Sequence, residues 1–450
     1  MSLLHIEGFD VIDSTTKSAL VGIDMSHQAK EAFTTNSEGD GSEYVVDPGT
    51  LTEFDVTGRY TGSTALKLNF KQHSGRTVDD DIGNGSTRTG NTGTWSRIPF
   101  AEQQALGSFT FGFAFKTSAI NSTHETTIAS IADNNGNPLL LLSYNTSGYL
   151  KAYLFNNTNA TYARTFRSSK ASSPSSDTVS SGPSNRLKNF VQDEYVNAGG
   201  STTDHSALGT GSAVIAADTW YTIECQVVEN SSKNYSVEVR LDDVVQIDSD
   251  NNAVSDNQCA NLHEVILLNA ILVDHATGSG FTQQPEHNHF FDDFYFLDDA
   301  GSNNTTFLGA AMRVQGLALG AANTTIDHNF SVSTGTVGGN LADFDTNTTA
   351  TLTNPGIGVF DIANPETVLT GNGIRYIATA KFATGATNLE FLSRIGTTNY
   401  TVNGTIHGGS AIALTSGFNT VQEIQELNPA TSAAYNETEL DALQVGLKAS

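Results

Sequence analysis

Residues 220–247 read WYTIECQVVENSSKNYSVEVRLDDVVQI and decide the fold of the chain. Apolar and polar residues alternate over 221–227 and again over 235–241, as in half-buried strands, whose successive side chains point to opposite faces. A polar cluster between the two runs predicts one turn, and Asp242-Asp243 predicts another before the last apolar residues. The stretch therefore predicts three consecutive antiparallel strands of an all-β sandwich, a scaffold that carries function in its loops or on a concave face.

Other segments repeat the strand pattern. Phe109, Phe111, Phe113 and Phe115 stand at strict period 2 with small residues between them, which predicts a central strand whose large side chains fill a core. Two apolar runs flank the turn sequence Asn-Thr-Ser-Gly at 145–148 and predict a hairpin.

Composition limits the class of protein. A chain of 450 residues exceeds one ordinary domain, and its formal net charge of −26 would repel nucleic acid phosphates. No stretch of the sequence has the eighteen consecutive apolar residues expected of a membrane span, and the first ten residues do not resemble a signal peptide. Cys225 and Cys259 form no CxxC pair, and we expect Cys225 to be a buried free thiol, with a disulfide as the alternative.

The chain divides into two predicted domains. Residues 1–300 are expected to form the sandwich, with a Ser/Gly-rich insertion at 168–212 whose composition cannot build much core. An Asp-, Gly- and Asn-rich stretch at 298–304 is the predicted boundary. Residues 305–450 are expected to form a smaller β domain.

The second domain is predicted to end in a short helix at 437–448. Asn436 is a suitable N-cap residue, and Glu439 stands three positions later, as in a capping box. Leu440, Leu443 and Leu447 then repeat at helical spacing, so the helix is expected to be amphipathic.

The first 300 residues resemble a concanavalin A-like, laminin-G-type jelly roll, which implies the expected fold class: all-β, a jelly-roll sandwich followed by a smaller β domain. Five segments carry the resemblance: Gly8-Phe9-Asp10, Ala65-Leu66-Lys67-Leu68, the strand at 109–116, Thr219-Trp220-Tyr221-Thr222-Ile223-Glu224, and Asp292-Asp293-Phe294-Tyr295.

The order of motifs along the whole chain resembles tailed-bacteriophage virion structural proteins. The further segments that carry this resemblance are Phe307-Leu308-Gly309, Arg313-Val314, Asn428-Pro429-Ala430-Thr431 and the run at 440–447. The resemblance implies a non-enzymatic structural protein of the virion, on the capsid or the tail. It also implies other virion proteins as partners and a homo-oligomer, preferably a trimer.

Catalytic motifs are absent from the sequence, which favours a protein that is not an enzyme. One group of jelly-roll glycosidases needs Glu-x-Asp-x-x-Glu on a strand, so that two carboxylates share a face. Here Glu224, Glu238 and Glu264 are isolated, and alternation places the first two on outward faces. Two rival functions remain: a host-adhesion lectin with a glycan platform at Trp95, and, less favoured, a polysaccharide depolymerase.

Two segments concentrate possible metal ligands. Asp79, Asp80 and Asp81 form an oxygen-rich turn of the kind that holds Ca²⁺ in lectin-like sandwiches. The alternative is that these residues serve turn geometry alone. The second segment carries His287, His289 and Asp292, of which the two histidines would share a strand face, and its alternative is a polar loop entering an edge strand.

Overall fold

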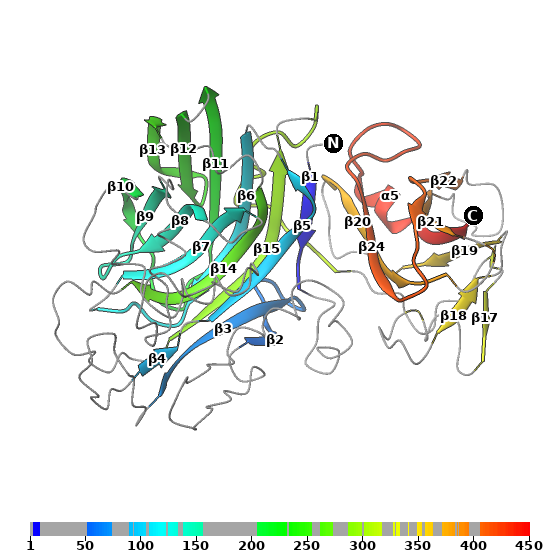
Figure 1. The fold of residues 1–450 in the computed structure, drawn as a ribbon, viewed down its shortest axis with the longest axis horizontal. Coiled ribbons are helices and arrows are strands. Elements are labelled where there is room, and N and C mark those ends of the chain that lie inside the picture. Colours follow the sequence, from blue (N-terminus) through cyan, green and yellow to red (C-terminus); the bar gives the residue numbers. More distant parts are fainter. Residues whose placement is uncertain are drawn as a thin grey trace, which may run out of the picture.

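The computed structural model consists of a two-sheet β-sandwich joined to a smaller β domain (Figure 1). The structure describes residues 3–9, 52–73, 90–92, 94–104, 108–122, 125–133, 138–155, 205–231, 234–253, 262–272, 287–298, 301–316, 327–328, 330–333, 341, 349–352, 356–362, 371–382, 385, 387–395 and 406–450. No helix among them is long and apolar enough to cross a membrane. The all-β, two-domain prediction is confirmed.

One layer of the sandwich is a nine-stranded antiparallel sheet of order β13-β12-β11-β6-β15-β3-β2, with β1 also paired to β15 and β4 to β3. The predicted three-strand unit forms its end, and the phenylalanine strand lies at its centre. The strands are β1 (Leu3–Glu7), β2 (Thr52–Thr57), β3 (Thr64–His73), β4 (Gly90–Thr92), β6 (Ser108–Thr117), β11 (Tyr221–Ser231), β12 (Asn234–Leu241), β13 (Val244–Ala253) and β15 (His287–Asp298).

The other layer is a six-stranded antiparallel sheet of order β10-β9-β8-β7-β14-β5. It contains the predicted hairpin, whose turn is closed by the Asn145 side chain accepting from the Ser147 and Tyr149 backbone N–H groups. The strands are β5 (Thr94–Gln104), β7 (Glu125–Asp133), β8 (Pro138–Tyr144), β9 (Tyr149–Phe155), β10 (His205–Val214) and β14 (Leu262–Leu272).

The expected insertion at 168–212 extends too far. Residues 205–212 belong to β10, and 168–204 lie outside the described residues. The glycines of β10 were read as loop composition, but they permit close packing on β13. A Cβ at Gly209 would lie 3.3 Å from Ile247, and one at Gly211 would lie 3.0 Å from Gln246. The close approach of β10 to β13 of the other sheet therefore leaves little room for side chains at Gly209 and Gly211.

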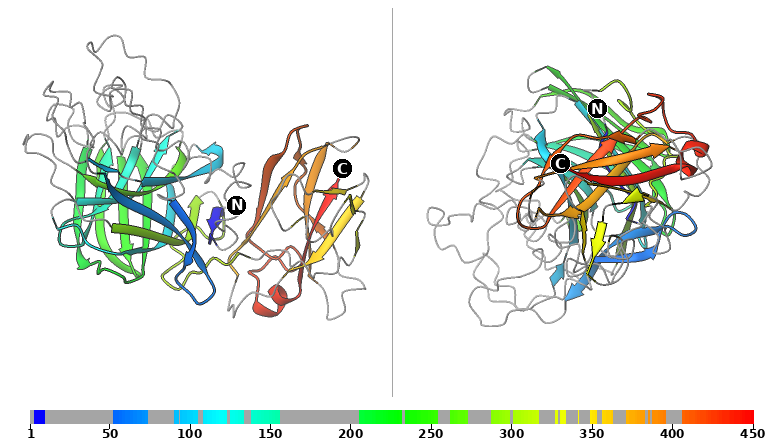
Figure 2. Two further views of the ribbon diagram at one scale, coloured as in Figure 1. Left: turned by 90° about the horizontal axis from the view of Figure 1, so that it is seen from below. Right: turned by 90° about the vertical axis from the view of Figure 1, so that its right-hand side faces the viewer.

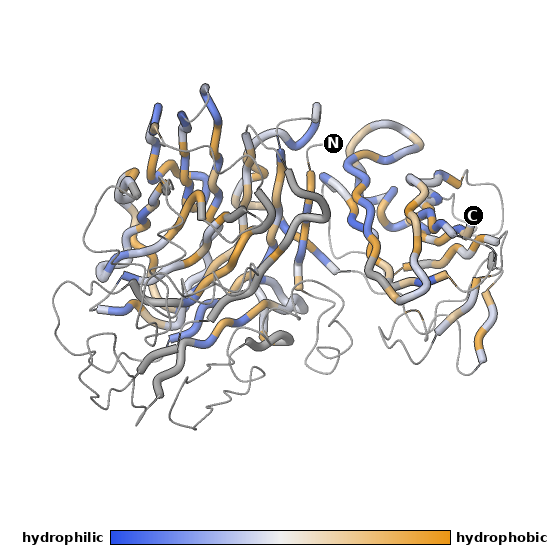
Figure 3. The backbone as a smooth tube through the Cα atoms, viewed as in Figure 1, coloured by the Kyte–Doolittle hydropathy of each residue, from blue (hydrophilic) through white to orange (hydrophobic). Residues whose placement is uncertain are grey.

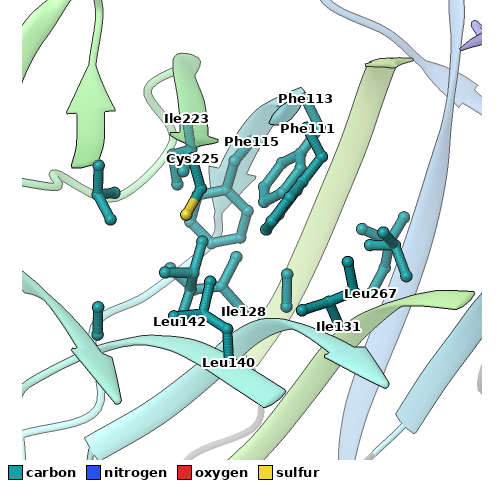
Figure 4. Packing of buried hydrophobic residues seen from close by; sticks show 14 of the residues in the cluster. Phe111, Phe113, Phe115, Ile128, Ile131, Leu140, Leu142, Ile223, Cys225 and Leu267 are labelled. Carbon is teal, nitrogen blue, oxygen red and sulfur yellow. The ribbon is translucent and has the colours of Figure 1, made fainter. Parts of the chain in front are cut away.

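The core lies between the two sheets. Phe111, Phe113 and Phe115 are fully buried and extend toward aliphatic residues of the facing sheet, among them Leu140 and Leu142 (Figure 4). Hydropathy alternates along the strands of the sandwich, as period 2 requires (Figure 3). Cys225 is a buried free thiol in this core, which confirms that prediction; burial raises the pKa of its thiol, and Glu238 adds to the rise.

The second domain packs a six-stranded sheet against two small ribbons. The sheet has the order β16-β19-β25-β21-β22, with β23 also paired to β21; β17 pairs with β18, and β20 with β24. The elements are β16 (Asp327–His328), β17 (Phe330–Val332), β18 (Ala350–Leu352), β19 (Gly356–Asp361), β20 (Ile374–Ala380), β21 (Asn388–Ile395), β22 (Ile406–Gly408), β23 (Ile412–Ala413), β24 (Asn419–Gln425), α5 (Glu437–Asp441) and β25 (Leu443–Ala449).

The predicted terminal helix is wrong beyond its first turn. The capping box of Asn436 and Glu439 is confirmed, but α5 ends at Asp441 and residues 443–449 form β25. Leu443, Val445 and Leu447 also alternate, so the segment fits both periods. Pairing with β19 on one side and β21 on the other decides for the strand.

The aromatic strand β6 should dominate the stability of the sandwich. We expect Phe113→Ala to lower the free energy of unfolding by about 3–5 kcal/mol, because it removes a buried ring and leaves a cavity. Val245→Ala, at a side chain that is 45% exposed, should change it by less than about 0.5 kcal/mol. Chemical denaturation measures both, and equal losses would contradict this account of the core.

Candidate functional site

The outer face of the six-stranded sheet carries a connected group of polar side chains, here called the Lys151 cluster: Glu125 of β7, Ser143 of β8, and Lys151 and Tyr153 of β9. Alternation selects them, because Leu150, Ala152 and Leu154 of β9 face the core and leave Lys151 and Tyr153 on the opposite side. Ser143 stands directly opposite Lys151 in the β8–β9 register.

The members of the Lys151 cluster form one hydrogen-bonded chain. Ser143 Oγ donates to Glu125 Oε1, and Lys151 Nζ donates to Glu125 Oε2 at 2.8 Å. Lys151 Nζ also lies 2.5 Å from the Tyr153 hydroxyl and 5.0 Å from the centre of its ring. Because ammonium groups only donate, the Tyr153 oxygen is the acceptor in this pair.

The cluster lies beside solvent at the end of its sheet. Ala207 and Thr210 of the neighbouring edge strand β10 stand opposite Tyr153 and Lys151, and both are exposed. The Lys151 side chain is 24% exposed, and that of Glu125 is 16% exposed. The charged groups are thus partly desolvated yet within reach of a solute.

The environment keeps both proton-bearing groups of the cluster protonated at neutral pH. Burial, and next the negative charge of Glu125, raise the pKa of Tyr153 to about 12. Burial lowers the pKa of Lys151, but the hydrogen bonds to Glu125 and Tyr153 outweigh it and raise that pKa overall. The site therefore offers an ammonium ion that directly contacts a phenol.

The predicted glycan platform and one predicted metal site fall largely outside the described residues. Asp79, Asp80 and Asp81 lie outside them entirely. The backbone of Trp95 lies in β5, at the edge of the six-stranded sheet and opposite Leu268, while its side chain is outside the described set. Both remain predictions.

His287 and His289 share a strand face as expected, with ring centres 5.6 Å apart, but both are buried. His289 Nε2 lies 2.9 Å from the Tyr144 hydroxyl, and its Nδ1 lies 2.8 Å from the Leu268 carbonyl oxygen. His289 thus links the two sheets. Burial, and next the nearby His287, hold its pKa well below its usual range.

Asp292 does not join the histidines as a ligand. Its Oδ2 accepts from the Arg59 backbone N–H at 2.9 Å and from Ser63 Oγ at 3.3 Å. Among the described residues, no group of three or more His, Cys, Asp or Glu side chains could hold a metal ion. In the described structure, His287, His289 and Asp292 therefore have structural partners.

Glu224 lies on an outward sheet face, as alternation predicts, but it is covered there. It lies on the outer side of the nine-stranded sheet but is only 1% exposed, because residues 307–312 of the interdomain segment cross over it. Its Oε1 accepts from the Tyr295 hydroxyl and, at 2.9 Å, from the Gly309 backbone N–H. Nothing in the strand pattern around Glu224 indicates this cover.

The sequence interpretation missed the Lys151 cluster. Residues 149–153 read Tyr-Leu-Lys-Ala-Tyr, so the signal was present: two tyrosines and a lysine alternate with core residues on one strand. The contribution of Glu125 was not visible, because it depends on the pairing of β7 with β8 and of β8 with β9.

No protein-family model matches the chain, and no curated protein matches it. Among solved structures, the chain is similar to an endo-β-1,4-glucuronan lyase from the fungus Trichoderma reesei, at 12% identity over 58% of this chain and 88% of that one, with a TM-score of 0.35. It is similar to an alginate lyase from Aplysia kurodai, at 13% identity over 55% of this chain and 87% of that one, with a TM-score of 0.33. It is also similar to alginate lyase A1-II', a member of polysaccharide lyase family 7. The identity is 11% over 57% of this chain and 86% of that one, and the TM-score is 0.31.

These findings contradict the functional prediction from sequence. The solved structures named above are polysaccharide lyases. The expectations of a non-enzymatic virion structural protein and of a chain that is not an enzyme are therefore wrong. The expected sandwich is shown by the strand pairing of the chain itself.

Proposed function

We propose that the chain is a polysaccharide lyase, with the Lys151 cluster on the outer face of the six-stranded sheet as its reactive centre. One observation carries the proposal: Lys151 Nζ lies 2.5 Å from the Tyr153 hydroxyl on a partly solvated sheet face. An ammonium group in that position stabilises a phenolate, and a phenol that can lose and regain a proton is a general acid–base catalyst.

Elimination fits these residues better than hydrolysis. The common hydrolytic route needs two carboxyl groups facing the scissile bond. Glu125 is the single carboxylate among the described members of the cluster, and it is held by Ser143 and Lys151. Elimination from a uronate-containing polymer needs a proton carrier and a cation near the carboxylate, which Tyr153 and Lys151 supply.

The proton can travel through Tyr153 alone. The Tyr153 phenolate takes the proton from C5 of the uronate, the C4–O4 bond breaks, and a C4=C5 double bond forms. The resulting phenol then gives the same proton to the departing O4 oxygen, so the enzyme ends in its starting state. Lys151 stabilises the phenolate and has a third N–H for the substrate carboxylate.

The Tyr153 hydroxyl should be indispensable. We expect Tyr153→Phe to lower the rate of cleavage of alginate or polyglucuronate by about 100-fold or more, because it removes the proton carrier. Tyr376→Phe is the matched control, since Tyr376 is also buried with its hydroxyl on a side chain, Gln425 at 3.2 Å. Ultraviolet absorbance of the new double bond measures cleavage. Wild-type activity in Tyr153→Phe, or no cleavage by the wild-type chain, would refute the proposal.

The rate should rise with pH. Tyr153 must be ionised to take the C5 proton, and its pKa is about 12. Below that value the ionised fraction grows about tenfold per pH unit, so the logarithm of the rate should climb with a slope near one through the mildly alkaline range. Initial rates across a pH series measure this. A maximum in the acid range would be incompatible with a tyrosine base.

Salt should accelerate cleavage of an acidic polymer. The chain carries a formal net charge of −26, which repels a polyanion at long range, while Lys151 attracts it locally. Raising the ionic strength from about 0.01 M to about 0.15 M shortens the Debye length from roughly 30 Å to 8 Å and screens the repulsion first. We expect KM to fall over that range; a steep rise in KM would contradict the assignment.

A further inference from the structure

The N-terminal strand β1 belongs to both domains. Its backbone pairs with β15 of the sandwich, and it lies between the sandwich and the β20–β24 ribbon of the second domain (Figures 1 and 2). Leu3, His5 and Glu7 alternate along it and are all buried. The Leu3 backbone N–H also donates to Glu426 Oε1 at 2.7 Å, beyond the end of β24.

One arginine joins the two domains. Arg375 of β20 donates from its Nη1 to the Ile6 carbonyl oxygen at 2.9 Å and to Glu7 Oε2 at 3.1 Å. Its Nε and Nη2 donate to Gln422 Oε1 of β24 at 2.9 and 2.6 Å. The guanidinium is therefore anchored to Gln422 in the second domain, and its Nη1 group binds β1.

The same guanidinium touches His5, and this contact suits the neutral form of the ring. Arg375 Nη1 lies 3.1 Å from His5 Nε2. A guanidinium only donates, so this contact is a hydrogen bond when Nε2 carries the lone pair, as in the neutral ring; Nη1 then shares its two N–H groups among three acceptors. The proton is then on Nδ1, which is buried without a hydrogen-bond partner.

We propose that His5 and Arg375 form a pH-sensitive latch, closed while His5 is neutral, that releases the second domain from the sandwich when His5 takes up a proton. Protonation would place two cations 3.1 Å apart in a buried interface and remove the acceptor from Nε2. The inference depends on contacts between the domains and is independent of the Lys151 cluster.

The surroundings of His5 favour the neutral ring. Burial, and next the charge of Arg375, hold its pKa well below the usual value. Two carboxylates lie on the groups around it: Glu7 of its own strand is paired with Arg375, and Glu426 of the second domain accepts from the Leu3 N–H. Strand β15 presents the ring of Phe294, 5.7 Å away and edge-on.

The sign of the pH effect follows from linkage. A histidine whose pKa is lowered in the docked state binds fewer protons there than in the released state. Docking is therefore strongest above the ordinary histidine pKa of about 6.5 and weakens as the pH falls below it. One such group lowers the docking equilibrium constant about tenfold per pH unit until the docked-state pKa is reached.

The interface is the part of the molecule that such a change can open. Its apolar contacts are the small cluster of Leu3, Tyr295, Leu297, Met312 and Ile424, whereas the sandwich is held by its own extended core. The contact between His5 and Arg375, which becomes repulsive when His5 is protonated, lies between the domains. We therefore expect the second domain to be released before the sandwich unfolds.

Hydrogen exchange of the full-length chain tests the latch. From about pH 8 to about pH 5, the histidine range, we expect protection of the Leu3 amide, which binds Glu426 across the interface, to fall about tenfold per pH unit below about 6.5 after correction for intrinsic exchange. Small-angle scattering should show a growing radius of gyration, while near-ultraviolet circular dichroism of the sandwich stays constant.

His5→Gln isolates the histidine. A glutamine oxygen can accept from Arg375 but does not titrate, so this variant should stay docked and lose the pH slope. His407→Gln, at a half-buried histidine of β22, is the matched control and should keep the wild-type slope. Arg375→Met should weaken docking at every pH. An unchanged slope in His5→Gln, or constant protection in the wild type, would overturn the proposal.

Discussion

The packing of aromatic rings between the two sheets is the constraint on which the rest of the molecule depends. Phe109, Phe111, Phe113 and Phe115 follow one another along the inner face of the central strand β6, and each must meet the facing sheet. That fixes the register of β11 and β15 on either side of β6. The opposite faces of both sheets are then determined by alternation, because a slip of one residue would turn every side chain over.

The outer faces obtained in this way have different uses. On the six-stranded sheet, the residues between core positions bring a lysine, a tyrosine and a glutamate together at a partly solvated end. On the nine-stranded sheet, the corresponding positions bind the interdomain segment. β1 adds a third arrangement, in which one strand pairs with β15 of the sandwich and accepts a hydrogen bond from Arg375 of the neighbouring domain. The Lys151 cluster is proposed as the reactive centre on the first face. The outer face of the nine-stranded sheet and strand β1 instead hold the two domains together.

Local sequence patterns predicted the fold, whereas strand β25 and the Lys151 cluster depend on the pairing of strands that are distant in the sequence. The alternation at 221–241, the phenylalanine strand and the Asn145 turn are properties of neighbouring residues, and the structure confirms each. Residues 443–449 fit two periods, and only their neighbours β19 and β21 make them a strand. The Lys151 cluster needed the pairing of three strands. The motif Asp292-Asp293-Phe294-Tyr295 carried the resemblance to a jelly roll. In the structure, Asp293 and Tyr295 bind the backbone of the segment that joins the two domains.

The segment that leaves the sandwich is held to it largely through its backbone. The backbone N–H groups of Leu308, Gly309, Ala310 and Val314 are bound in turn by Tyr295, Glu224, Asp243 and Asp293. Every residue except proline has such a group, so these four bonds place no demand on the side chains, whereas Leu308, Met312 and Val314 are constrained by packing in the apolar cluster at the interface. Gly309 is also constrained, since its φ of +89° favours glycine. An insertion or deletion would displace all later donors from their carboxylates, so selection there acts on length.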